Sequence, residues 1–241
     1  MVKPKYKILA VIAARDEEDR IKGLLKNIEN FVDGAVFLDD GSKDNTKEII
    51  KKSNLVLDVI EHPKRKSADY NVGVNLSELI GRAKKYKPEY LFLIDPDERI
   101  EKNAREKFEK EVNINKNCLG FGFKLRELWD DKNQYRYDGI WGTKMKWNIF
   151  KNAVFQTFEF KKHHNYFLPL NVVKDISHKA KKVDINIYHL KMINKQDRII
   201  RWEKFKKLDP TNKFQSIGYD YMIDTKGLKV KKISKGREYN E

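Results

Sequence analysis

The sequence predicts an α/β protein with a mostly parallel central sheet flanked by helices, in a Rossmann-like arrangement. Within the first 95 residues, four short apolar runs alternate with stretches of helical spacing. These runs are almost continuously apolar, which is typical of strands buried on both faces. Strands that alternate with helices imply right-handed crossovers, and therefore a parallel sheet covered by helices on both sides.

The elements of the first half follow in order from these patterns. Strands are expected at residues 6–13, 34–39, 55–61 and 90–95. Between the first two, Asp16 is expected to cap a helix whose first turn carries acids, because these favour the positive end of the helix dipole. Two more helices are expected over about 43–52 and 68–86.

The second half changes character. The sequence predicts the following elements: a charged surface helix at 101–112, a glycine-containing strand at 119–128, an aromatic, turn-rich stretch at 129–150, a strand at 184–188 and a basic helix at 194–208. Glycines inside a strand permit close approach of other groups to the backbone. Residues from Lys226 onward are polar and basic and are expected to be loosely ordered.

Composition limits the classes of protein to consider. A chain of 241 residues with 51 Lys and Arg against 36 Asp and Glu is long enough for one full core and attracts polyanions. The single cysteine, Cys118, excludes an internal disulfide framework and a cysteine-based zinc site. A single cysteine is also typical of an intracellular protein, so we expect a cytoplasmic location. The N-terminal apolar run is short and is interpreted as a core strand rather than a signal peptide.

Acidic residues follow three of the four predicted strands. The first strand ends in "AARDEE", the second in "DDGSKDNT" and the fourth in "DPDER". Helix capping alone accounts for any one of these turns. Three of them at the carboxyl edge of one parallel sheet, where such folds bind ligands, favour a binding site.

The turn "DPDER" carries the most specific chemistry. Asp95 and Asp97 flank Pro96, which stiffens the turn. Two carboxylates at this spacing can converge on one cation, and their hard oxygen atoms suit Mg²⁺ or Mn²⁺. Such an ion binds phosphate oxygens and offsets negative charge on a departing diphosphate.

Taken together, "AARDEE", "VFLDDGSKDNT" and "FLIDPDER" resemble the nucleotide-sugar-binding half of an inverting glycosyltransferase of the large family-two type, with a GT-A fold. The resemblance covers roughly residues 6–100, and "DPD" matches the DxD metal motif of that family. Ala13 and Asp16 stand where the family usually has proline and asparagine, so the first loop departs from the pattern.

The resemblance implies a role for particular residues. The nucleotide sugar would lie along Ala14, Arg15, Glu17, Asp39, Asp40, Lys66 and Asp95. Within this set, Asp39 and Asp40 would receive the base and ribose. Lys66, or its neighbour Lys64 or Arg65, would approach the base or diphosphate. The metal would be held by Asp95, Asp97 and His189. A lone histidine such as His189 is more often structural, and its metal role rests on the resemblance.

The catalytic base is left open among three residues. Inversion needs a group that takes the proton of the acceptor hydroxyl as it attacks the anomeric carbon. The Glu-Asp pair that often does this in the family is absent, and the candidates are Asp138, Glu159 and His164. Because that pair is missing, a retaining reaction stays open as an alternative.

The resemblance implies a single domain over residues 1–225, with a basic tail over 226–241. Residues 1–100 would form the nucleotide-sugar-binding half, 101–190 the acceptor side and 191–225 a helical segment. The expected donor is a UDP- or GDP-sugar with Mn²⁺ or Mg²⁺, and the acceptor is an unknown glycan, lipid or protein.

Two rival functions are weighed against this one. A nucleotidyltransferase shares the sheet and the metal, but usually carries a glycine-rich loop after the first strand, and "AARDEEDR" has no glycine. A basic nucleic-acid-binding protein is suggested by charge alone and gives no reason for acids at three strand ends. Basic residues in the last 45 positions are either a solvated face or a contact with an anionic membrane at its inner face: Arg198, Arg201, Lys204, Lys206 and Lys207.

Overall fold

The computed structural model describes residues 5–63, 72–155, 176–213 and 215–241. Its main feature is an eight-stranded mixed sheet with the order β3-β2-β1-β4-β8-β6-β9-β5. The strands of this sheet are β1 (Ile8–Ala14), β2 (Gly34–Asp39), β3 (Val56–Glu61), β4 (Tyr90–Leu93), β5 (Glu98–Ile100), β6 (Gly120–Glu127), β8 (Met145–Lys151) and β9 (Ala180–His189). A two-stranded sheet pairs β7 (Gln134–Arg136) with β10 (Val230–Lys232).

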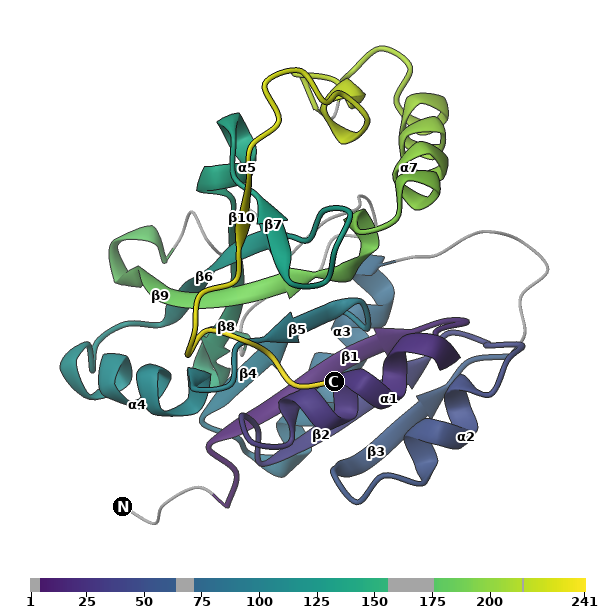
Figure 1. The fold of residues 1–241 in the computed structure, drawn as a ribbon. Coiled ribbons are helices and arrows are strands. Elements are labelled where there is room, and N and C mark those ends of the chain that lie inside the picture. Colours follow the sequence, from purple (N-terminus) through teal and green to yellow (C-terminus); the bar gives the residue numbers. More distant parts are fainter. Residues whose placement is uncertain (1–4, 64–71, 156–175, 214) are drawn as a thin grey trace.

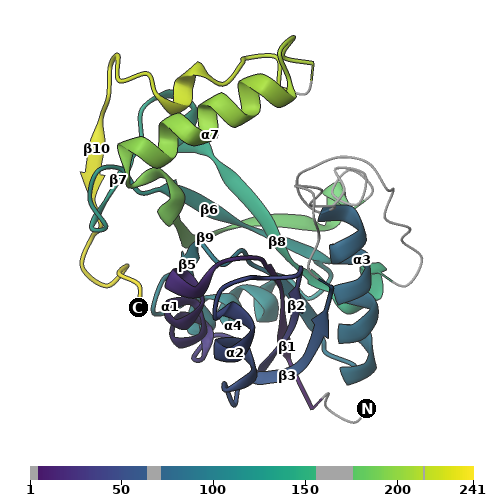
Figure 2. The ribbon, with the colours of Figure 1, turned by 90° about the vertical axis from the view of Figure 1, so that its right-hand side faces the viewer.

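Helices cover both faces of the main sheet (Figure 1). The α-helices are α1 (Glu18–Ile28), α2 (Thr46–Lys51), α3 (Val72–Ala83), α4 (Ala104–Ile114), α5 (Gly139–Thr143) and α7 (Lys195–Leu208). Short 3₁₀ turns complete the order: η1 (Lys84–Tyr86), η2 (Asn152–Phe155), η3 (Ser177–Lys179), η4 (Leu190–Met192) and η5 (Asp220–Met222). Figure 2 shows α3 on one face, with α1, α2 and α4 on the other. The predicted α/β class and its central sheet flanked by helices are confirmed.

The strand β1 shows why the sheet needs helices on both faces. Alternate side chains point to opposite faces of a strand, and those of β1 enter two different cores. Ile8, Ala10 and Ile12 pack in the core under α1 and α4, while Leu9 and Val11 pack in the core under α3. All five are at most 2% exposed, so the continuous apolar run is explained by burial on both faces.

The N-terminal half forms the parallel part of the sheet. β1 pairs in parallel with β2 and β4, and β2 pairs in parallel with β3. In the register, Ala14 lies beside Asp39, and Asp39 lies beside Glu61. The carboxyl ends of these strands therefore lie at one edge, as the strand pattern predicts.

The C-terminal half completes the sheet by pairing distant segments. β8 lies antiparallel between β4 and β6, and β9 lies between β6 and β5. The strands β5, β7 and β8 were not predicted, because each is short or lies in the aromatic stretch. Gly122 in β6 lets the Trp147 ring of β8 approach, since a Cβ there would lie 2.9 Å from a ring carbon.

The basic tail packs against the rest of the protein, and the expectation that it is loosely ordered is wrong. β10 pairs with β7, and the backbone of Tyr239 forms an isolated antiparallel β-bridge with that of Glu101. The Arg237 guanidinium donates to the buried carboxylate of Glu101 at 2.7 Å. The amide of Asn27 in α1 donates to the carbonyl oxygen of Asn240 at 3.1 Å, and Figure 1 shows the C-terminus lying over α1.

A separate, largely aromatic cluster packs among α5, α7 and η5, and Figure 1 shows α5 and α7 above the main sheet. It is formed by Trp129, Trp141, Met192, Tyr219 and Met222, all at most 6% exposed. Most of the aromatic stretch is therefore core. No helix among the described residues combines the length and apolar composition needed to cross a bilayer.

Candidate active site

The loops that follow β1 and β2 are joined by hydrogen bonds at the carboxyl edge of the sheet. The backbone N–H groups of Asp16 and Glu17 donate to the hydroxyls of Ser42, at 3.1 Å, and Thr46, at 2.7 Å. In return, the N–H of Lys43 donates to the carboxylate of Asp16 at 2.7 Å. The small polar residues of "DDGSKDNT" therefore hold the neighbouring loop in place.

These contacts correct two details of the predicted helix starts. Asp16 does not cap α1: it has a left-handed backbone (φ +53°) and accepts a hydrogen bond from the loop after β2. Glu17 is the N-cap of α1, and its side chain makes no capping hydrogen bond. α2 begins at Thr46 rather than about residue 43, because Gly41 (φ +78°) turns the chain and the next residues bind the first loop. Ser42 thus serves the loop contact and does not begin the helix.

Asp39 and Asp40 lie at the end of β2 and are both buried, at 3% and 0% exposure. The Asp39 carboxylate accepts from the N–H of Ser42 at 3.3 Å. The Asp40 carboxylate lies 3.9 Å from the Arg15 guanidinium and 2.9 Å from His62 Nδ1. Three residues that the sequence assigned to the nucleotide, Arg15, Asp39 and Asp40, are therefore brought together at this edge.

The DPD turn places its two carboxylates against different cations. Asp95 accepts from Lys146 Nζ at 2.8 Å, and the same ammonium donates to Glu98 at 2.5 Å. The Asp95 side chain is 60% exposed, whereas that of Asp97 is 9% exposed. Burial raises the pKa of Glu98 to about 7 against the opposing attraction of Lys146. Asp95 thus faces outward from the edge, and Asp97 faces inward.

Asp97 lies against His189, and the sheet itself creates this contact. In the register, His189 at the end of β9 pairs with Glu98 of β5 on one side and with Glu127 of β6 on the other. The His189 ring contacts Asp97 through Nε2 at 3.2 Å and Glu127 through Nδ1 at 2.6 Å. Lys191 lies 3.5 Å from the Asp97 carboxylate.

Asp97, Glu127 and His189 form a buried cluster in which each charge stabilises the opposite charge beside it. Burial alone would lower the pKa of His189, but the carboxylates of Glu127 and Asp97 raise it to about 10. Burial alone would raise the pKa of Asp97, but His189 and Lys191 hold it well below its usual range. Glu127 is likewise kept ionised by His189 and by Lys144, whose ammonium donates to it at 2.9 Å. The cluster therefore consists of charged groups in mutual contact.

The buried Arg99 ties the DPD turn to α1. Its guanidinium donates to the carbonyl oxygens of Pro96, at 2.9 Å, and Arg20, at 3.0 Å. Gly23 makes room for it, because a Cβ at that position would lie 2.7 Å from the guanidinium. The turn that carries Asp97 is therefore fixed to the helix that follows the first loop.

Glu17 lies close enough to Asp97 for the two charges to interact. Burial raises the pKa of Glu17, and the nearby Asp97 charge adds to this, while Arg20 and Lys191 oppose it. Arg20 donates to Glu17 at 2.9 Å. Glu17, assigned to the nucleotide from the sequence, thus lies between the first loop and the DPD turn.

Asp138, one of the three base candidates, is held by a buried arginine. It accepts two bonds from Arg136, both at 2.9 Å, and a third from the N–H of Lys229 at 3.0 Å. The bonds from Arg136 are the main cause of the lowered pKa of Asp138. These contacts describe a structural carboxylate that joins β7 to the C-terminal segment. The other two candidates, Glu159 and His164, and the nucleotide residue Lys66 lie outside the described residues.

Several charged residues of the site were missed in the sequence. Glu127 and Lys146 lie in strands, and only the non-local pairing of β6, β8 and β9 brings them to the edge. Glu127 did carry a signal, because it is an acid at the end of an apolar strand like Asp39. His62, which the sequence gave no role, contacts Asp40 directly.

The residues fit a divalent ion held by few protein ligands. No group of three or more His, Cys, Asp or Glu side chains suited to a metal occurs in the described part of the chain. Asp97 and His189 Nε2, however, lie 3.2 Å apart, close to the roughly 3 Å between adjacent ligands of an octahedral ion. Glu127 behind Nδ1 is the kind of partner that orients a ligating histidine. A pair of protein ligands suits an ion that also binds phosphates.

The mixed sheet with helices on both faces is the GT-A fold found in glycosyltransferases. The model of the family "Glycosyl transferase family 2" matches residues 9–196. The chain belongs to this family, and the resemblance of its three motifs is thereby confirmed. No curated protein matches the chain in sequence.

Solved structures with the same fold are distant in sequence. S. aureus TarS is 13% identical with a TM-score of 0.59; the match covers 83% of this chain and 40% of TarS, so the chain spans less than half of that protein. TarS 1–349 has also been solved with UDP-GlcNAc, with 12% identity, a TM-score of 0.57, and 90% and 70% of the two chains covered. Glucosyl-3-phosphoglycerate synthase from Mycobacterium tuberculosis, in complex with Mn²⁺, UDP and glucosyl-3-phosphoglycerate, is 12% identical with a TM-score of 0.53, over 84% and 80%.

Proposed function

We propose that this protein transfers a sugar from a UDP- or GDP-sugar to an acceptor, with Mn²⁺ or Mg²⁺ bound at the DPD turn. The observation that carries the proposal is the contact between Asp97 and His189, backed by Glu127, at the edge that also holds Asp39 and Asp40. Family membership supports the reaction class, and the fold neighbours solved with UDP-GlcNAc, or with UDP and Mn²⁺, support the donor and the metal.

The residues of the first two loops are proposed to bind the nucleotide. Asp39 and Asp40 carry acceptor oxygens suited to the N–H of a base and the hydroxyls of a ribose. Ala14, Arg15 and Glu17 would lie along the nucleotide, and Lys66 would approach its base or diphosphate. The hydrogen bonds between the two loops support this role, because they fix both sides of the nucleotide site before the donor binds.

Asp97 and His189, with Asp95 beside them, would hold the divalent ion. The ion supplies positive charge to the diphosphate of the donor as that group leaves. A ligating imidazole is neutral, so the ion would replace the proton on His189 Nε2 while Nδ1–H keeps its bond to Glu127. Lys191, close to Asp97, would add a further positive charge near the leaving group.

The reaction is proposed to be a single displacement with inversion. The acceptor oxygen forms a bond to the anomeric carbon, the bond to the diphosphate oxygen breaks, and the nucleoside diphosphate leaves. The proton of the acceptor hydroxyl passes to the base. Of the three candidates, Glu159 and His164 are preferred, because Asp138 is held by Arg136. The anomeric configuration of the product, read by NMR, separates inversion from retention.

The test is a panel of UDP-, GDP- and dTDP-sugars, assayed for binding and for slow hydrolysis with Mn²⁺ and with a chelator. We expect one nucleotide class to bind and to be hydrolysed only when the metal is present. Indifference to every nucleotide sugar under both conditions would overturn the proposal. A nucleotidyltransferase would instead release pyrophosphate from a nucleoside triphosphate and a sugar phosphate, which a separate assay with those two substrates detects.

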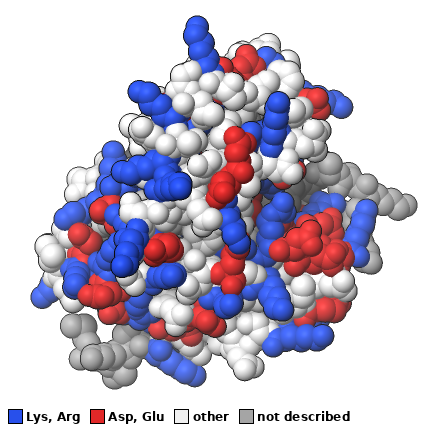
Figure 3. Space-filling view, in the orientation of Figure 1, with Lys and Arg blue, Asp and Glu red and all other residues white. Residues whose placement is uncertain are grey.

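The C-terminal segment is proposed to contact an anionic membrane from the cytoplasmic side. Residues 191–236 hold thirteen Lys or Arg against five Asp or Glu, and α7 exposes Ile200 at 54% and Leu208 at 56% beside Lys204 and Lys207. Exposed aliphatic groups among lysines suit an anionic bilayer surface. On the face drawn in Figure 3, acidic and basic side chains are interspersed, which does not favour nucleic acid.

Sedimentation with vesicles tests the membrane contact. The protein should pellet with vesicles rich in phosphatidylglycerol more than with pure phosphatidylcholine. Ile200→Ser should weaken pelleting, while Ile114→Ser, a substitution at the 75% exposed Ile114 of α4, should not. Equal pelleting with both kinds of vesicle would contradict the contact.

A further inference from the structure

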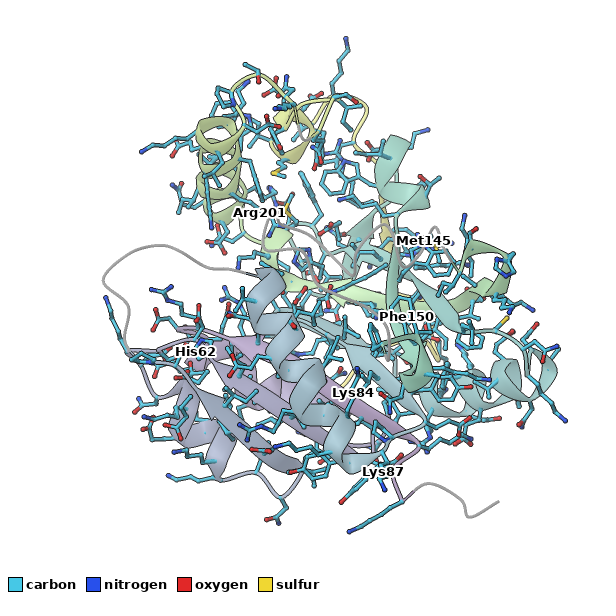
Figure 4. The ribbon with its side chains drawn as sticks, turned by 180° about the vertical axis from the view of Figure 1, so that it is seen from behind. His62, Lys84, Lys87, Met145, Phe150 and Arg201 are labelled. Carbon is cyan, nitrogen blue, oxygen red and sulfur yellow. The ribbon has the colours of Figure 1, made fainter. Side chains whose placement is uncertain are left out.

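His62 follows β3 and contacts both acids at the end of β2. Its backbone N–H donates to the carbonyl oxygen of Asp39 at 2.9 Å. Its ring Nδ1 lies 2.9 Å from the Asp40 carboxylate, and its Nε2 lies 2.8 Å from the Glu78 carboxylate of α3. One side chain thus joins β2 to the helix that covers the sheet, and Figure 4 shows it at the end of α3 opposite to Lys84 and Lys87.

The contacts determine the protonation state of the ring. Ionised carboxylates only accept hydrogen bonds, so both ring nitrogens of His62 must carry a proton, which is true only of the imidazolium. Partial burial alone would lower the pKa of His62, but the bonds to Asp40 and Glu78 raise it above its usual value. The His62 side chain is 13% exposed, that of Asp40 is fully buried and that of Glu78 is 43% exposed.

We propose that His62 is a positioning residue for donor binding: its protonated ring joins Asp40 to Glu78 and so fixes the carboxylate that receives the nucleotide. This role rests on the proposed function. Among the residues that the structure describes, the charged groups in contact with the His62 ring or with the Asp40 carboxylate are Asp40, Glu78 and Arg15. His62 is the histidine of this set, and histidine is the residue type whose charge commonly changes between pH 5 and 8.

The sign of the pH dependence follows from the two bonds. Below the raised pKa of His62, the imidazolium donates to both carboxylates and Asp40 is held. As the pH rises through that value, the ring loses one proton, and a nitrogen lone pair then faces one of the carboxylates. The hold on Asp40 weakens, so affinity for the nucleotide is expected to fall as the pH rises.

Nucleotide binding tests the proposal in solution. The dissociation constant of UDP or GDP with Mg²⁺ is measured by calorimetry from pH 6 to 8.5 for wild type, His62→Gln and His178→Gln. We expect His62→Gln to bind about 10-fold more weakly at pH 6, with KM raised, kcat little changed and a flatter pH profile. His178, an exposed residue of the 3₁₀ turn η3, is the matched control and should behave as wild type. An unchanged affinity and profile for His62→Gln would overturn the proposal.

A measurement without ligand separates this proposal from the proposed function. NMR titration of the His62 ring should give a pKa above 6.5, and Glu78→Gln should lower it. A His62 pKa at or below 6.5 that Glu78→Gln does not change would show that the ring does not join Asp40 to Glu78, and would overturn the proposal. If wild type binds no nucleotide although the bridge is present, the donor-binding function fails and this role of His62 fails with it.

Discussion

The two halves of the sheet build the candidate site in different ways. In the first half, three parallel neighbours, β1, β2 and β3, come from one stretch of chain, and their register aligns Arg15, Asp39 and His62 at one edge. In the second half, β9 brings His189 between Glu98 of β5 and Glu127 of β6. These two residues lie some 60 to 90 positions before His189 in the sequence. The proposed nucleotide side of the site is therefore local in sequence, and the proposed metal side depends on distant pairing.

The largest expected effect is at Asp97, where the two halves meet. Asp97→Asn keeps the shape of the side chain but removes the charge that faces His189. We expect turnover of the nucleotide sugar to fall by about 10²–10³-fold, because the ion loses its buried carboxylate. Steady-state kinetics with Mn²⁺ measure this. Asp131→Asn, at an exposed turn, is the matched control, and equal losses for both variants would contradict the role of Asp97.

A smaller effect is expected behind the metal, at Glu127. Glu127→Gln leaves His189 with a neutral partner and should weaken Mn²⁺ binding by about 10–100-fold. Titration of Mn²⁺ by electron paramagnetic resonance measures the free ion directly. Loss of turnover with unchanged Mn²⁺ affinity would show that Glu127 acts on something other than the metal.

Substitution of Asp138 should reduce turnover less than substitution of the proposed metal ligands. Because Arg136 and the Lys229 N–H already occupy its carboxylate, Asp138→Asn should reduce kcat by less than about tenfold, well below the 10²–10⁴-fold contribution of a catalytic base. The same substitution should lower the melting temperature, since it weakens a bond to a buried guanidinium. A large loss of kcat with an unchanged melting temperature would restore Asp138 as the base, and Glu159→Gln and His164→Gln test the other candidates.

Substitutions at two glycines compare how tightly side chains pack in the two halves of the protein. Gly122→Ala in β6 forces a Cβ against the Trp147 ring and should destabilise the protein by about 1–3 kcal/mol. Gly81→Ala in α3 meets nothing within 4 Å and should stabilise it by about 0.5–1 kcal/mol. Urea unfolding of both variants measures the difference, and a stabilising Gly122→Ala would contradict the close contact of β6 with β8.

The same contrast explains what the sequence could predict. The strand at 34–39 was placed at its observed bounds, and β1 and β3 to within two residues at either end, because continuous apolar runs mark buried parallel strands. The acids of these strand ends were identified by their position. Lys146 and Glu127 were not, because no local pattern shows which distant strands will pair. The tail after Lys226 was mistaken for loose chain, since short polar strands such as β10 have no apolar periodicity.

The central claim is that this edge holds a nucleoside diphosphate through a divalent ion. Calorimetry of wild type and Asp97→Asn with UDP and GDP, in Mn²⁺ and in chelator, tests it most directly. We predict that one nucleotide binds wild type at least about tenfold more tightly with Mn²⁺, and that Asp97→Asn loses this dependence. Nucleotide affinity that is the same with metal and with chelator in both proteins would contradict the claim.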